Sequence, residues 1–232
     1  FKGKIEFKNV RFEYISNIEV LKGISFSVNP GETLAIVGPT GSGKTTIINL
    51  ISRLYDTTDG KIHIDGRSIN DYTLSCLRDN IGLILQDVFL FADTIQNNVT
   101  LFDEHISKEQ VVATAKELGI HDFIMSLPDD YSFNVQERGN TLSAGQKQLI
   151  AFMRVLIKNP DILILDEATS SIDSYSEDLI KSATKKITKN KTSVIIAHRL
   201  STIEAASTII YMEDGLILEI GNHKELMGIE NG

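Results

Sequence analysis

Apolar residues recur at every second position in the first thirty residues. This spacing covers 5–14 and returns over 24–28, just before the turn residues Asn29, Pro30 and Gly31. Because successive side chains of a strand point to opposite faces, the alternation is typical of a sheet with one buried face. The sequence therefore predicts an N-terminal antiparallel β subdomain.

Other segments are apolar at every position, which indicates strands buried on both faces of a parallel sheet. They cover 34–37, 81–85, 162–165 and 193–197. Two further runs, 209–212 and 216–220, flank Glu213-Asp214-Gly215 and predict a hairpin. Together with helical patterns between them, these strands predict an α/β fold with a mostly parallel sheet.

Helical spacing appears over 47–54 and in a long segment without strand character. Ser107 with Gln110 forms a capping box that opens a helix over 108–118, which Gly119 closes. Ser143 with Gln146 opens a second helix, which ends at 158–160, and a third begins near Ser174. We predict one domain in which 1–87 and 148–232 form the core and 88–147 forms an inserted α-helical subdomain.

Composition narrows the classes of protein to consider. The chain has 232 residues, a formal net charge of −8 and no cluster of basic side chains, so a nucleic-acid partner is not expected. Its only cysteine, Cys76, suits a reducing compartment. No apolar run approaches the roughly 20 residues of a membrane-spanning helix. We expect a soluble fragment of a longer chain, since it opens on Phe1 rather than Met.

The stretch GPTGSGKTT follows an apolar strand and precedes a helix. Its G-x-x-x-x-G-K-T spacing is that of a P-loop, in which glycines let backbone amides converge on phosphate oxygens. Lysine adds a point charge, and the Thr45 hydroxyl can ligate Mg²⁺. An ordinary glycine-rich turn is the alternative. The predicted phosphate-binding residues are Gly38, Pro39, Thr40, Gly41, Ser42, Gly43, Lys44, Thr45 and Thr46.

Polar residues follow three of the apolar strands. Asp166 and Glu167 come after 162–165, where Asp166 would hold hydrated Mg²⁺ and Glu167 would orient or deprotonate a water molecule. His198 follows 193–197 and is interpreted as a γ-phosphate contact. Gln86 follows 81–85 and can reach metal and water. Each of these residues also has a structural alternative, as a polar strand end or a packed histidine.

The stretch Leu142-Ser143-Ala144-Gly145-Gln146 combines a helix cap with small residues, which is typical of an anion site at a helix N-terminus. The P-loop already provides for one phosphate. A second anion site is redundant unless it serves the nucleotide of another copy. On spacing alone, an ordinary capped helix is the better explanation.

These motifs together resemble the nucleotide-binding domain of ATP-binding cassette (ABC) transporters along essentially the whole chain. GPTGSGKT resembles its Walker A motif, LSAGQ its signature, ILILDE its Walker B, SSID its D-loop, which ends at Asp173, and IAHRL its switch-histidine region. The resemblance implies a P-loop NTPase core that binds ATP and Mg²⁺. Residues 90–98 and 137–139 are similar to the exporter-type coupling segment and X-loop, which face a membrane domain.

The resemblance also assigns single residues. Tyr14 matches the aromatic that stacks on adenine, although strand packing also explains it. Gln86 matches the Q-loop glutamine and is a candidate metal ligand with Thr45 and Asp166. Ala144 departs from the usual LSGGQ, because its methyl removes the freedom of glycine to adopt positive φ. If that position is helical the alanine costs little, and if closure needs glycine geometry it weakens the site.

The function implied is ATP hydrolysis by a head-to-tail dimer. The P-loop of one copy and Ser143, Ala144, Gly145 and Gln146 of another would enclose each ATP, with Lys44 and Ser143 sharing the γ-phosphate charge. The partner is a like or unlike nucleotide-binding domain. An exporter membrane domain, fused N-terminally, would hold the pair at the cytoplasmic face of the membrane. Alternatives are a soluble nucleotide-gated clamp and a regulatory module without turnover.

Overall fold

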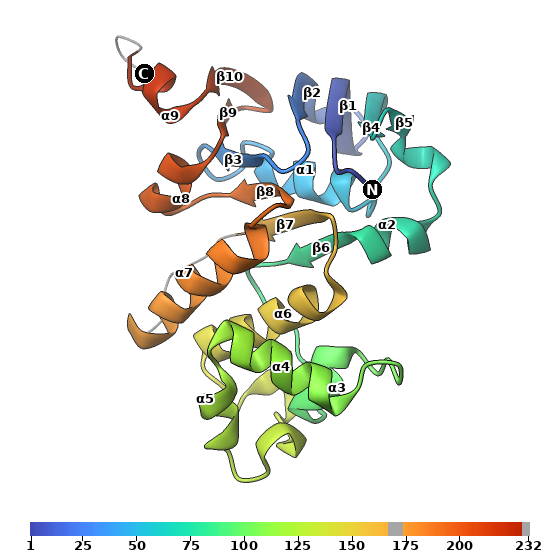
Figure 1. Cartoon of the computed structure of the whole chain (residues 1–232). Coiled ribbons are helices and arrows are strands. Elements are labelled where there is room, and N and C mark those ends of the chain that lie inside the picture. The colour runs from blue at the N-terminus through green and yellow to red at the C-terminus, as the bar shows by residue number, and fades with distance from the viewer. Residues whose placement is uncertain (167–173, 229–232) are drawn as a thin grey trace. The chain divides into compact units, whose positions relative to one another are not determined.

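Figure 1 shows the computed structural model, which describes residues 1–166 and 174–228. The chain forms two compact units. The first unit contains 1–83, 160–168 and 190–232, and the second contains 84–159 and 169–189. The helical subdomain predicted over 88–147 falls inside the second unit. None of the helices in the described ranges has the length and hydropathy needed to cross a bilayer.

The first unit contains a four-stranded antiparallel sheet in the order β2-β1-β4-β5. Its strands are β1 (Ile5–Ile15), β2 (Ile18–Val28), β4 (Asp59–Ile64) and β5 (Arg67–Ser68). The alternation seen in the sequence buries one face, where the Phe7 and Phe26 rings stack with centroids 4.4 Å apart. The predicted antiparallel β subdomain is confirmed.

A second sheet has the order β10-β9-β3-β8-β7-β6. Its central strands β3 (Thr33–Val37), β8 (Thr192–Ile196) and β7 (Ile162–Asp166) run parallel, as does β9 (Thr208–Glu213) beside β3. The outer strands are β6 (Ile81–Ile84) and β10 (Leu216–Gly221). Helix α1 (Lys44–Ile51) follows β3. The predicted mostly parallel sheet is confirmed.

The hairpin between β9 and β10 follows its turn chemistry. Asp214 and Gly215 both have positive φ, 48° and 79°, which matches the right-handed twist of the paired strands. A side chain at Gly215 would place its Cβ 2.3 Å from the carbonyl oxygen of Val20, so glycine is required there. The remaining short helices of the first unit are η1 (Ile69–Asp71), α2 (Leu74–Asn80), α8 (Leu200–Ala205) and α9 (His223–Leu226).

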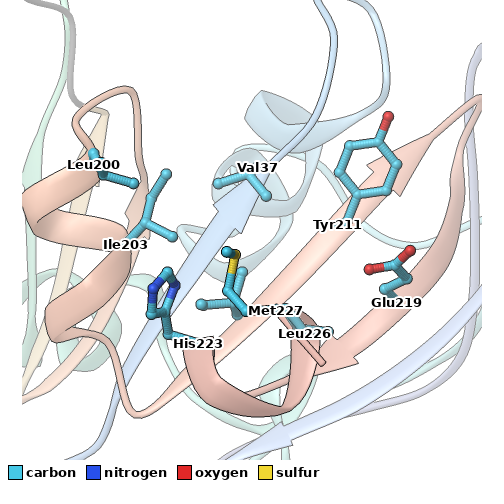
Figure 2. Close-up of a pocket in the computed structure, with 9 residues that line it drawn as sticks. Val37, Leu200, Ile203, Tyr211, Glu219, His223, Leu226 and Met227 are labelled. Carbon is cyan, nitrogen blue, oxygen red and sulfur yellow. The ribbon is translucent and has the colours of Figure 1, made fainter. Parts of the chain in front are cut away.

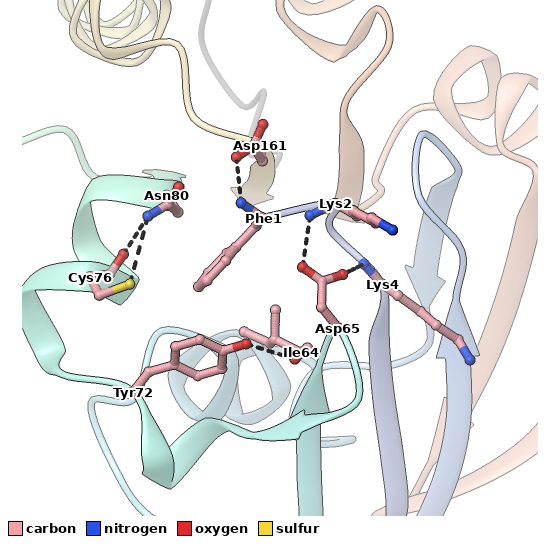
Figure 3. Close-up of polar contacts among 9 residues, drawn as sticks. All are labelled: Phe1, Lys2, Lys4, Ile64, Asp65, Tyr72, Cys76, Asn80 and Asp161. Atoms are coloured by element: carbon pink, nitrogen blue, oxygen red, sulfur yellow. Dashed lines mark hydrogen bonds and ion pairs between the residues drawn. The ribbon is translucent and has the colours of Figure 1, made fainter.

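The first four residues are fixed to the antiparallel sheet by Asp65 (Figure 3). Its carboxylate accepts hydrogen bonds from the backbone amides of Lys2 (2.7 Å) and Lys4 (2.9 Å). The Phe1 ring packs edge-on against Tyr72, with centroids 4.9 Å apart. These contacts define the entry of the chain into β1.

The second unit is helical. It contains α3 (Ile95–Thr100), α4 (Lys108–Leu118), α5 (His121–Met125), η2 (Asp130–Ser132), η3 (Glu137–Gly139), α6 (Ala144–Lys158) and α7 (Ser174–Thr188). Helix α6 packs against α3, α4 and α7. Both predicted capping boxes form, at Ser107 and Ser143, and Gly119 ends α4 in a left-handed conformation. The helix limits predicted from these caps are confirmed.

Candidate functional site

The glycine loop between β3 and α1 has the backbone conformation that its sequence predicts. Gly38, Gly41 and Gly43 have φ values of 145°, 85° and 103°, a range that L side chains rarely adopt. The amide of Ser42 donates to the carbonyl of Pro39 at 3.2 Å, which closes the turn. Gly43 then caps α1 in a left-handed conformation. Residues with positive φ in such a loop let successive backbone amides point into one concave site.

The three glycines are required for different reasons. A Cβ at Gly38 would lie 2.0 Å from the carbonyl oxygen of Met212, and one at Gly43 would lie 2.8 Å from Cδ2 of Leu21. A Cβ at Gly41 would meet no heavy atom within 4 Å. Gly38 and Gly43 therefore let the loop pack closely against Met212 and Leu21. Gly41 faces open space, from which a ligand can approach.

Lys44 begins α1 and folds back over the loop. Its Nζ donates to the carbonyl oxygens of Gly38 at 2.8 Å and Pro39 at 2.7 Å. Burial lowers the pKa of Lys44, and the negative charge of Asp166 partly offsets that shift. Ser42 is also buried, and its Oγ has no hydrogen-bond partner within the described residues. The loop thus holds a cation and, two residues before it, an unpaired hydroxyl.

The next two threonines have different surroundings. Thr45 is exposed at the start of α1, whereas Thr46 is buried, with its Oγ1 at 3.3 Å from the Tyr14 hydroxyl. Asn49 also donates to that hydroxyl, at 3.1 Å. The Tyr14 ring is edge-on to Tyr55, with centroids 5.1 Å apart, and is 46% exposed. The structure therefore fixes this aromatic beside the P-loop helix and leaves part of its surface accessible.

The register of the parallel strands aligns Asp166 of β7 with the end of β3, the strand that leads into the P-loop. Ile196 of β8 pairs with Ile36 of β3 on one side and with Asp166 of β7 on the other. Asp166 is therefore aligned with Ile36, near the end of β3, at the carboxyl edge of the sheet. His198 follows β8 by two residues at that edge and is exposed. Parallel α/β sheets bind their ligands at this edge.

The structure does not place the remaining predicted site residues beside the P-loop. Glu167 and Asp173 lie outside the described residues. Gln86 is exposed just after β6 and belongs to the second unit. The signature residues Ser143, Ala144, Gly145 and Gln146 also belong to the second unit, so the structure does not place them or Gln86 relative to the P-loop.

The signature segment forms a complete capping box. Ser143 Oγ accepts from the amide of Gln146 at 3.3 Å, and the Ser143 amide donates to Gln146 Oε1 at 2.9 Å. Ser143 and Ala144 are exposed, while Gly145 is buried. Ala144 is the first residue of α6 and does not have positive φ. In this structure the methyl group therefore causes no backbone strain.

A separate groove of about 470 Å³ lies between β9, β10, α8 and α9 (Figure 2). Its walls are mainly apolar, and Glu219 is the acidic side chain that lines it. A carboxylate repels phosphate groups, and the P-loop amides do not line this groove. It is therefore a poor site for a nucleotide, although Val37 at its edge directly precedes the P-loop. The remaining lining residues are Leu200, Ile203, Ile209, Tyr211, His223, Leu226 and Met227.

Sequence reasoning missed Arg154, a charged side chain in the apolar helix α6. It donates to the backbone carbonyls of Phe89 and Asn98 and to the side chain of Asn98. An arginine that interrupts the apolar run 149–157 was the available signal, because a buried charge needs specific partners.

Open amides and a cation at a helix start suit the phosphates of a nucleotide, and a carboxylate at the neighbouring strand end suits a divalent cation bound with them. The first unit is accordingly a P-loop nucleotide-binding fold. The family model described as ABC transporter matches residues 21–170, which is more than half of the chain. The chain belongs to the ABC transporter family, as its ATP-binding ATPase domain. The resemblance drawn from the sequence is confirmed.

The relatives are longer proteins whose names describe an exporter or a flippase. The chain is 48% identical over 99% of its length to a putative multidrug export ATP-binding/permease protein of Bacillus subtilis, covering 40% of that protein. It is 48% identical over 97% of its length to an ATP-dependent lipid A-core flippase of Saccharophagus degradans, covering 39%. A solved bacterial Atm1-family ABC exporter with ATP bound matches with a TM-score of 0.90 at 43% identity, over 97% of this chain and 39% of that one. The chain thus spans about two fifths of the length of these relatives.

Proposed function

We propose that this chain is the motor domain of an exporter and hydrolyses Mg-ATP to drive transport. The observation that carries the proposal is the P-loop itself, in which Gly41 opens toward solvent while Lys44 is held over the loop. The names of the relatives support export as the coupled process. The transported substrate would be recognised outside this chain.

The residues fit magnesium as well as phosphate. Thr45 presents an exposed hydroxyl at the start of α1, and Asp166 supplies a carboxylate close enough to Lys44 to influence its pKa. Oxygen ligands of this kind are those that Mg²⁺ prefers when phosphates complete its coordination. Gln86 is a further candidate ligand. When bound, the metal would neutralise charge that builds up on the phosphate oxygens.

The protein groups then have distinct roles in hydrolysis. Glu167 would accept a proton from the water that attacks the γ-phosphorus, as the bond to the β-phosphate oxygen breaks and ADP leaves. Lys44 would exchange its loop carbonyls for phosphate oxygens. His198, exposed at the carboxyl edge of the sheet, would contact the γ-phosphate. Tyr14 would stack on the adenine ring.

The signature segment would act on the nucleotide of a second copy. Ser143 is exposed at the N-terminus of the 15-residue helix α6, which favours an anion there. Ala144, Gly145, Gln146 and the D-loop residue Asp173 would complete this half of the site. A head-to-tail dimer would then enclose two ATP molecules, and hydrolysis would open it.

The membrane partner is inferred from two relatives, named as an ATP-binding/permease protein and a lipid A-core flippase, each more than twice as long as this chain. We propose an N-terminally fused membrane domain, with this chain at the cytoplasmic face. An exposed aromatic patch, Phe89, Phe91 and Phe102, is suited to docking such a partner. The rings of Phe89 and Phe91 meet edge-on at 5.2 Å, and those of Phe91 and Phe102 at 5.8 Å.

The role of Glu167 is tested by steady-state hydrolysis of Mg-ATP. We expect Glu167→Gln to lower kcat by roughly 100-fold or more while ATP still binds, as for removal of a general base. Glu117→Gln, in an exposed position of α4, is the matched control and should leave kcat unchanged. An unchanged rate in Glu167→Gln would remove Glu167 as the base.

A further inference from the structure

Arg154 is half-buried on α6 and uses its guanidinium to hold two separate backbone positions. Nε donates to the carbonyl oxygen of Asn98 at 2.6 Å, and Nη1 donates to that of Phe89 at 2.8 Å. Nη2 donates to the side-chain oxygen of Asn98 at 3.0 Å. Burial lowers the pKa of Arg154 to about 10, so the group stays charged at neutral pH. Within the described parts of the chain, its hydrogen-bond acceptors are all neutral oxygens.

Asn98 extends this contact into the preceding loop. It is fully buried, and its side-chain oxygen also accepts from the amide of Phe91 at 2.8 Å. Its Nδ2 donates to the carbonyl oxygens of Phe91 and Thr94, each at 3.0 Å. The asparagine therefore closes the 91–94 loop on itself, while Arg154 joins that closed loop to α6.

The loop that is held in this way carries the aromatic patch. Phe89 is 56% exposed and Phe91 is 42% exposed, and Arg154 or Asn98 bonds to the backbone of both. Ser143 caps the start of α6, eleven residues before Arg154, or about 16 Å along the helix. A single rigid helix therefore links the aromatic patch to the signature segment within the second unit.

We propose that Arg154 and Asn98 are positioning residues that fix the aromatic patch to the signature helix, so that displacement of the patch moves Ser143. The inference rests on the proposed function, because it gives the patch a partner and Ser143 a nucleotide. A planar guanidinium suits this positioning role, since it can donate hydrogen bonds to the carbonyls of Phe89 and Asn98 at the same time. A lysine ammonium keeps the charge but lacks that geometry.

The hydrogen bonds of Arg154 and Asn98 form what we call the brace between the aromatic patch and α6. Hydrogen exchange on this chain without nucleotide tests the brace independently of activity. We expect Arg154→Lys to speed amide exchange by about 10-fold or more in 89–98 and also in the first turn of α6, because both lose a shared support. Lys158→Met, which removes an exposed charge from the same helix, is the control and should alter neither segment. Faster exchange in 89–98 with an unchanged first turn of α6 would overturn the proposal, as would no change in either.

Kinetics separate positioning from general damage to the fold. We expect Arg154→Lys to lower kcat for ATP hydrolysis at least about 5-fold with KM for ATP within about 2-fold, because the P-loop is in the other unit. Asn98→Ala should act in the same way. If Arg154→Lys unfolds, Asn98→Ala carries the test. Equal losses in kcat and ATP affinity would contradict the brace, whereas full turnover in Glu167→Gln would contradict only the proposed function.

Discussion

The ammonium of Lys44 lies 2.8 Å from the carbonyl oxygen of Gly38, so the P-loop lysine is satisfied by its own loop. A second carbonyl, that of Pro39, is 2.7 Å away. A nucleotide must therefore replace bonds that already exist, and it can do so because phosphate oxygens carry charge while carbonyls do not. The lysine is held in place for phosphate without needing a counter-ion in the loop.

Lys44→Ala should weaken ATP binding by about 10-fold or more, because a charge-assisted contact to phosphate is lost. The fold should survive, since Lys44 donates its side-chain hydrogen bonds to two carbonyls of its own loop. Titration with a fluorescent ATP analogue, next to a thermal unfolding curve, makes the comparison. Lys61→Ala, in an exposed position of β4, is the control. Wild-type affinity in Lys44→Ala would contradict the assignment of the phosphate site.

Gly38→Ala and Gly41→Ala should differ sharply in stability. The first places a Cβ at 2.0 Å from a backbone oxygen and forces the loop off β9. The second meets open space and adds only left-handed strain, about 1–2 kcal/mol. Urea unfolding should give a low midpoint, or no folded protein, for Gly38→Ala and a modest shift for Gly41→Ala. Equal losses would mean that close packing at Gly38 has no special role.

Asp65 should make the stability of the first unit depend on acid pH. Burial by itself raises the pKa of Asp65, but hydrogen bonds from the amides of Lys4, Lys2 and Gly3 outweigh it and bring the pKa below 3.8. A depressed folded pKa contributes stability above the unfolded value, and that stability is lost as pH falls through the folded pKa. Asp65→Asn should therefore be less stable than wild type at pH 7, with a smaller gap at pH 3.

Unfolding curves at several pH values measure this difference. Asp71→Asn, which changes an exposed acidic residue of η1, is the control. A gap between wild type and Asp65→Asn that stays constant from pH 7 to pH 3 would contradict the role given to these amide bonds.

Ala144→Gly tests whether the unusual signature weakens turnover. Since Ala144 is the first residue of α6 and lacks positive φ, glycine should slightly destabilise the helix, by up to about 1 kcal/mol. We expect kcat for ATP hydrolysis to stay within about 3-fold of wild type. A rise of an order of magnitude would show that dimer closure needs glycine geometry that this structure does not contain.

Much of the fold could be predicted because local chemistry and long-range packing agree. Both capping boxes, the Asp214-Gly215 turn and the buried strands within 34–37, 162–165 and 193–197 occur where the sequence places them. The predicted burial of 81–85 was wrong in part, because Leu85 lies beyond the end of β6 and is 41% exposed. The short helices α2 and α8 were missed because each has too few residues for a periodic pattern.

The candidate site was predictable to the extent that its residues lie in contiguous motifs. The P-loop, Asp166 and Ser143 could each be read from a strand end or a helix start. The Arg154–Asn98 contact could not, because it joins residues far apart in the chain through hydrogen bonds that leave no local spacing. Such contacts depend on tertiary packing rather than on pattern.

The most direct test of the account is the solution mass of Glu167→Gln, measured by light scattering with and without Mg-ATP. We predict that the mass doubles only with Mg-ATP, and that Ser143→Arg added to this variant abolishes the doubling while ATP still binds. A protein that binds ATP and stays monomeric at high concentration, or that dimerises regardless of Ser143, would contradict the shared nucleotide site.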